Sequence, residues 1–135
     1  MVVRVKVIRD VMEQNFSMPI KADSLNPLIN ALVNCLPYKR RWVVGGFQKK
    51  WKAATKKHGG KLKTVCTFPA QIQFYARFKF MYRRDICDLY CKSIIDQLVE
   101  MGIFPDDNVL FINNVSYGGE IGAKTNEIEV KIISP

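Results

Sequence analysis

The chain has 135 residues, of which 48% are hydrophobic and 11% aromatic, with four cysteines and a formal net charge of +9. This length and apolar content exclude a disordered linker protein and predict a single domain over residues 1–135 with a substantial core. No stretch approaches the roughly 20 apolar residues of a membrane span. Without a signal peptide, we expect a cytoplasmic protein with reduced thiols and no membrane partner.

The N-terminal third predicts a strand followed by a helix. Val3–Ile8 alternates apolar and basic residues, which is typical of a half-buried strand. Residues 11–23 are mixed in character and predict a connection. A helix is predicted over Leu25–Leu36, after a capping Asp or Ser, and Pro37 marks its end.

The next segment, Tyr38–His58, is rich in aromatic and basic residues. Gly45-Gly46 is predicted to interrupt it, leaving a helix from about Phe47 to Lys57 that ends before a pair of glycines. Trp51 would lie on the apolar face of this helix, in the core or in a dimer interface.

A second alternating segment, Ile72–Phe80, predicts a strand whose apolar side chains face the core or a dimer interface. Its outward Arg77 and Lys79 would extend a basic surface. Residues 85–101 then predict a helix that is closed by Gly102.

The C-terminal part predicts two more strands, Val109–Val115 and Ile128–Ile133, with a turn at Tyr117-Gly118-Gly119 between them. Helices and strands are interspersed without strict βαβ alternation, so we expect an α+β fold with a small mixed sheet packed against helices. The four cysteines have irregular spacing and are expected as small apolar core residues.

The charge of the chain reverses near residue 85. Residues 1–84 carry 18 Lys and Arg against 3 acids, whereas residues 85–135 carry 3 against 9. Such asymmetry favours a nucleic-acid partner over an anionic membrane surface, with a merely solvated basic face as the simpler alternative. The residues expected to contact nucleic acid are Lys39, Arg40, Arg41, Lys49, Lys50, Lys52, Lys56, Lys57, Arg83 and Arg84.

The predicted helix over residues 85–101 carries a polar stripe. At about 100° per residue, Asp85, Asp88, Lys92 and Asp96 fall on one side of it. Carboxylates at this spacing can hold Mg²⁺, with Mn²⁺ as a possible substitute, and such an ion can activate a water for attack on a phosphate.

The turn after this helix could add a further ligand, since Asp106 and Asp107 precede the next strand. From the residues alone, simpler interpretations stay open. Asp88 and Lys92 form an ordinary i,i+4 pair, and two Asp followed by Asn is ordinary turn composition.

The order of the whole segment resembles a known family. Arg84-Asp85-x-x-Asp88-x-x-x-Lys92-x-x-x-Asp96-x-Leu98, followed by Gly102-Ile-Phe-Pro-Asp106-Asp107, is similar to the signature region of the RusA-like Holliday-junction resolvases of bacteria and their phages. The clear match covers about residues 83–112. Weaker similarities are Ser24-Leu25-Asn26 and the stretch from Arg41-Trp42 to Trp51.

The resemblance implies metal-dependent cleavage of four-way DNA junctions by a homodimer. It assigns the metal to Asp85, Asp88 and Asp107, with Asp106 and Asp96 as accessory or structural residues of the site, and it makes Lys92 the catalytic lysine. The family's basic surface would correspond to Lys39–Arg41, Lys49–Lys57, Lys61 and Lys63.

One departure from the family pattern concerns the first two acids. The family has Asp-x-Asp-Asn, whereas this chain has Asp85-Ile-Cys-Asp88-Leu, with one extra residue and no Asn. On a helix, one extra residue turns the second carboxylate by about 100°. The alternative is therefore a catalytically altered relative that binds nucleic acid without cleaving it.

Overall fold

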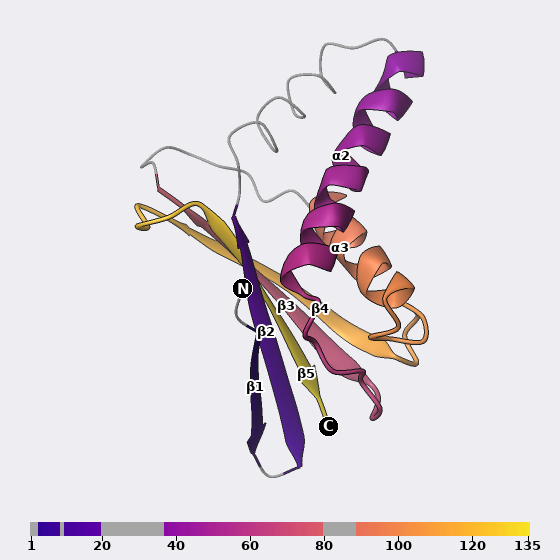
Figure 1. Cartoon of the computed structure of the whole chain (residues 1–135), viewed down its shortest axis with the longest axis vertical. Coiled ribbons are helices and arrows are strands. Elements are labelled where there is room, and N and C mark those ends of the chain that lie inside the picture. Colours follow the sequence, from indigo (N-terminus) through magenta and orange to yellow (C-terminus); the bar gives the residue numbers. More distant parts are fainter. Residues whose placement is uncertain (1–2, 9, 20–36, 80–88) are drawn as a thin grey trace.

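The structure is a computed structural model that describes residues 3–8, 10–19, 37–79 and 89–135, with only the backbone described for residues 37–47 and 89–91. The predicted helix over Leu25–Leu36 lies outside these residues. In chain order (Figure 1) the elements are β1 (Val3–Ile8), β2 (Val11–Pro19), α2 (Pro37–His58), β3 (Ala70–Phe78), α3 (Leu89–Glu100), β4 (Ile112–Ile121) and β5 (Glu127–Ser134).

The strands form one five-stranded sheet in the order β1-β2-β5-β3-β4. All neighbours are antiparallel except β3 and β4, which are parallel and are connected through α3. The predicted α+β fold with a mixed sheet is thus confirmed. Because α3 returns the chain so that β4 can run parallel to β3, the residues that follow α3 lie at the starting ends of both strands.

The core lies between one face of the sheet and the helices. In β3 the buried residues alternate with more exposed ones, and Ile72, Phe74 and Ala76 are at most 3% exposed. Ile94 and Leu98 of α3 are fully buried, and Trp51 of α2 is 3% exposed. The apolar period of two in β3 and the i,i+4 spacing in α3 therefore predicted these core faces correctly. The half-buried face predicted for β1 is wrong, because Val5 and Val7 are 38% and 67% exposed on a strand at the edge of the sheet.

The prediction of a connection over residues 11–23 is wrong for Val11–Pro19, which form β2. The inward row of this strand contains a polar residue, Gln14, between the apolar residues Met12 and Phe16. This Gln interrupts the apolar alternation on which strand prediction depends. It is tolerated because its amide is hydrogen-bonded to the backbone of Lys63.

The prediction that Gly45-Gly46 interrupts the helix is also wrong, whereas the helix end predicted at Pro37 belongs to Leu25–Leu36, outside the described residues. Pro37 begins α2, a position where its missing N–H is not needed, and the helix continues through both glycines. A glycine inside a helix costs up to about 1 kcal/mol relative to Ala but leaves the hydrogen-bond ladder intact. The predicted end at His58 is confirmed, and the N-terminal half of α2 extends beyond the sheet (Figure 1).

The third strand prediction was misplaced. Val109 and Leu110 are each 77% exposed in a turn, and β4 begins only at Ile112. The glycines that predicted a turn lie inside β4. A Cβ atom at Gly118 would lie 3.0 Å from Cδ1 of Tyr75, so this glycine permits the close approach of β4 to β3.

Two further predictions concern small elements. Gly102 closes α3 with a φ of 79°, a conformation that glycine adopts without strain. Cys66, expected in the core, is exposed, because the segment before β3 buries its neighbour Val65 instead. The other three cysteines lie outside the described side chains.

Candidate nucleic-acid surface and carboxylate turn

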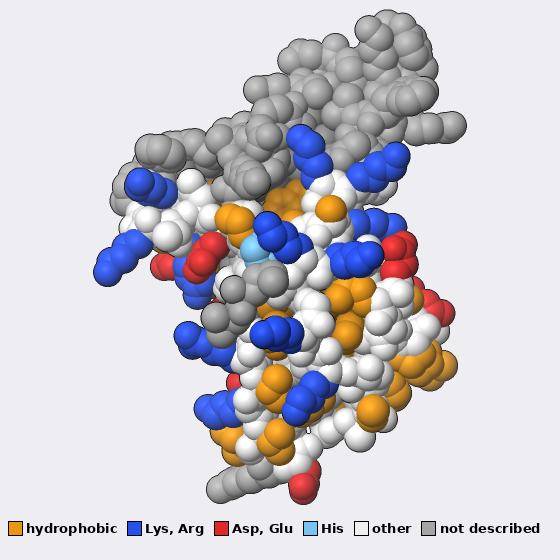
Figure 2. Space-filling view, in the orientation of Figure 1, with side chains coloured by type: hydrophobic (Ala, Val, Ile, Leu, Met, Phe, Trp, Pro, Cys, Tyr) orange, Lys and Arg blue, Asp and Glu red, His pale blue; other side chains and the backbone are white. Residues whose placement is uncertain are grey.

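A row of exposed lysines follows the C-terminal half of α2 and the segment after it. We call this set the basic ridge; its members are Lys49, Lys50, Lys56, Lys57, Lys61 and Lys63. Figure 2 shows Lys and Arg side chains along α2 and beyond its end. Cations near a helix C-terminus also interact favourably with the helix dipole, and Lys56 and Lys57 lie in the last turn of α2.

Two buried residues set the rotation of α2. Trp51 and Thr55 are one helical turn apart and both face the core, at 3% and 0% exposure. The Thr55 hydroxyl donates to the carbonyl of Trp51 at 2.8 Å and lies 3.7 Å from Sδ of Met18 in β2. With this face buried, the lysines between and beyond these positions are directed to solvent.

Lys52 of α2 is paired with an acid of α3. Its Nζ lies 2.8 Å from Oε1 of Glu100, so the pair connects α2 to the end of α3. The hydrogen bond to Glu100 raises the pKa of Lys52. We therefore leave Lys52 out of the basic ridge, although it was predicted to contact nucleic acid.

The segment after α2 is fixed by hydrogen bonds to distant parts of the chain. The backbone of Lys63 makes two bonds to the side chain of Gln14. Two residues later, the N–H of Val65 donates to the carbonyl of Ile103 at 2.9 Å. The far end of the basic ridge is thus joined to the segment that leads to Asp106 and Asp107.

The carboxylate of Asp106 stabilises its own turn. It accepts hydrogen bonds from the N–H of Asp107 at 2.7 Å and from Nδ2 of Asn108 at 3.3 Å. The backbone bond from Asp107 is the main reason that the pKa of Asp106 is lowered. The turn interpretation of Asp106 is therefore supported by its contacts, and both Asp106 and Asp107 are exposed.

Lys92 and Asp107 lie at opposite ends of α3. Lys92 is in the first turn, where its Nζ lies 3.8 Å from Oδ1 of Asp96, and Glu100, eight positions further on, lies about 12 Å along the helix axis. The carboxylates of Asp85 and Asp88 lie outside the described residues, as do the side chains of Lys39–Arg41 and Arg83-Arg84.

Within the part of the chain that the structure describes, no three His, Cys, Asp or Glu residues are close enough to hold a metal ion. Asp107 offers the oxygen donor that Mg²⁺ prefers and has the exposure that a ligand residue needs. The fit of a metal to this turn alone is therefore incomplete, and any such site needs carboxylates from residues 80–88.

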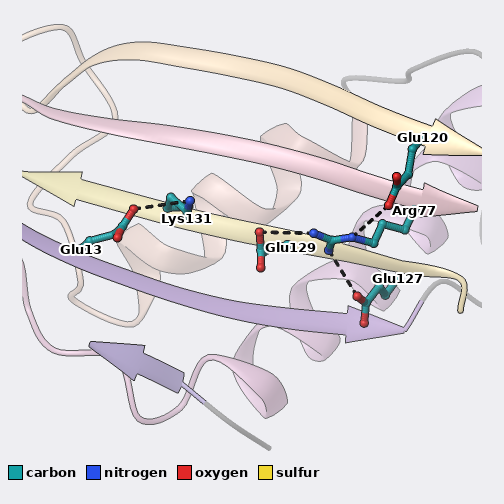
Figure 3. A network of polar contacts seen from close by, with 6 residues as sticks. All are labelled: Glu13, Arg77, Glu120, Glu127, Glu129 and Lys131. Atoms are coloured by element: carbon teal, nitrogen blue, oxygen red, sulfur yellow. Dashed lines mark hydrogen bonds and ion pairs between the residues drawn. The ribbon is translucent and has the colours of Figure 1, made fainter. Parts of the chain in front are cut away.

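Arg77 was expected to extend the basic surface, and this prediction is wrong. Its guanidinium lies within 3.7 Å of carboxylates from β4 and β5 (Figure 3), those of Glu120, Glu127 and Glu129. Three acids around one base make this part of the sheet's outer face acidic. The signal was present in the sequence, since the glutamates alternate along β5, but their pairing with Arg77 depends on strand order.

The outer face of the sheet also contains a shallow hollow of about 420 Å³ with mixed charge. Its lining residues are Arg4, Asn15, Ser17, Arg77, Glu127 and Glu129. A face on which bases and acids alternate offers no continuous attraction to a polyanion. The basic ridge is therefore the stronger candidate for binding nucleic acid.

Comparisons with known proteins give no relative from which a family could be assigned. No protein-family model and no curated protein matches the chain. Over the described residues, neither helix combines the length and apolar character needed to cross a membrane.

Proposed function

We propose that the protein is a Mg²⁺-dependent endonuclease that resolves four-way DNA junctions as a homodimer, in the cytoplasm of a bacterial or phage-infected cell. The observation that carries this proposal is the link between the two candidate regions. The basic ridge ends in a segment whose Val65 is hydrogen-bonded to Ile103, three residues before Asp106. This bond joins the segment that carries Lys61 and Lys63 to the segment that leads to Asp107, while the four-way junction, the metal and the dimer rest on the resemblance of residues 83–112.

In this proposal one group of residues binds the DNA backbone and another takes part in phosphodiester cleavage. The six lysines of the ridge would neutralise backbone phosphates and release their counterions. Asp107, with Asp85 and Asp88 from outside the described residues, would hold the metal, which would supply an activated water when bound. Lys92 would stabilise negative charge on the scissile phosphate.

A cleavage assay on a synthetic four-way junction tests this proposal. We expect wild-type protein to nick opposed strands with Mg²⁺, and Asp107→Asn to bind the junction without nicking it. Glu13→Gln is the matched control, because Glu13 lies on the outer face of the sheet and pairs with Lys131. Tight binding by wild-type protein without any cleavage in Mg²⁺ or Mn²⁺ would refute the catalytic part.

The second candidate is a protein of this kind that binds nucleic acid without cleaving it. Two observations favour it. The carboxylate of Asp106 accepts a hydrogen bond within its own turn. Most of α3 also lies between Lys92 and Asp107 along the chain. This candidate requires binding that depends on salt but not on divalent metal. Equal affinity with Mg²⁺ and with EDTA, together with no cleavage, would select it.

A further inference from the structure

Gln14 is a polar residue in an apolar row. It is 0% exposed on the inner face of β2, between the buried side chain of Phe16 and the half-buried Met12. Its Nε2 donates to the carbonyl of Lys63 at 2.9 Å, and its Oε1 accepts the N–H of Lys63 at 2.7 Å. One side chain thus pairs with both backbone groups of a residue 49 positions away, as a neighbouring strand would.

The two bonds persist because the buried amide of Gln14 has no good alternative partner. A buried amide that loses its partners costs about 1–3 kcal/mol, so the carboxamide stays with Lys63. An apolar residue at position 14 would fill the same space without holding the segment. Packing of the core alone therefore does not account for Gln at this position.

The segment that Gln14 holds displays two members of the basic ridge. Leu62 and Val65 are buried at 8% and 2% exposure, while Lys61 and Lys63 are exposed. Because Leu62 and Val65 pack into the core and the backbone of Lys63 is hydrogen-bonded, the backbone that carries the two lysines is rigid. A rigid charge loses less conformational entropy on binding than one on a mobile loop.

We propose that Gln14 is a positioning residue of the nucleic-acid surface, which fixes the backbone of Lys63 so that Lys61 and Lys63 continue the ridge of α2 as one surface for a sugar-phosphate backbone. This inference rests on the nucleic-acid binding of the proposed function. It adds that the surface is built from two elements, α2 and the segment after it, and that an uncharged buried residue controls the second.

The test is a double-mutant cycle read through salt dependence. Lys61→Gln with Lys63→Gln removes two phosphate contacts and should make the negative slope of log K against log salt less steep by about 1.8. Gln14→Met, which changes no charge, should make the slope less steep by up to the same amount. In the Lys61→Gln, Lys63→Gln background, Gln14→Met should change neither slope nor affinity. Gln73→Met, on the outer face of β3, is the matched control and should behave as wild type.

A wild-type slope in Gln14→Met, or an additive loss in the triple variant, overturns the inference. Hydrogen exchange on wild-type protein gives a measurement that needs no variant. The Lys63 amide should exchange as slowly as the amides of β2, and free exchange of that amide also overturns the inference. If wild-type protein binds no nucleic acid, the proposed function fails, whatever the exchange of Lys63 shows.

Discussion

The basic ridge makes a quantitative prediction about salt. If all six of its lysines contact phosphates, the slope of log K against log salt is about −5.4, since each contact contributes about −0.9. Between 50 and 200 mM salt the affinity should then fall by roughly 2,000-fold. Replacing Lys56 and Lys57 by Gln leaves four contacts, so the slope becomes about −3.6 and the fall roughly 150-fold.

Fluorescence anisotropy with a labelled four-way junction measures both slopes. The matched control is Lys124→Gln with Lys131→Gln, which removes the same charge from the turn before β5 and from the outer face of the sheet. We expect this control to keep the wild-type slope. Equal slopes for the two double variants would show that net charge, and not the ridge, governs binding, and would refute the assignment of the surface.

Three further predictions concern stability and titration. Gly118→Val places a Cβ atom 3.0 Å from Cδ1 of Tyr75. Urea unfolding should therefore show a free energy of unfolding that is lower by about 1–3 kcal/mol. Ser116→Val, on the same face of β4, is the control and should not lower it. Arg77→Met leaves three glutamates without their shared base and should lower the free energy of unfolding by about 1–2 kcal/mol. Lys79→Met should lower it less. Equal losses of stability in the two variants would contradict the ion-pair network. The carboxyl of Asp106 should titrate below its ordinary pKa of 3.8, so its contribution to the turn is complete above that pH and is lost as the pH falls through the lowered value. An NMR titration midpoint at or above 3.8 would contradict this.

The sequence predicted best where one periodicity was unbroken. The alternation in β1 and β3 predicted the strands and the inward side of β3, and the i,i+4 apolar spacing predicted the buried face of α3. Prediction failed at β2 and β4. Gln14 breaks the inward row of β2, and the glycines of β4 have the composition of a turn, although here they allow two strands to approach.

The candidate site shows the same division. Exposed lysines on α2 follow from an apolar face that contains Trp51, so the part of the ridge on this helix could be predicted from its pattern. The role of Arg77 could not, because its three partners come from two other strands. The carboxylates that the resemblance groups with Asp107 lie outside the described residues, and their grouping stays a prediction.

By itself, the sequence determined the mixed α+β class, the buried faces of β3 and α3 and the concentration of lysines, because each depends on the pattern of a local segment. Only the tertiary structure decided which long-range pairs form. It buried Gln14 against the backbone of Lys63 and surrounded Arg77 with glutamates. Such contacts join residues far apart in the chain. They depend on the order of the strands in the sheet, which no local sequence pattern encodes.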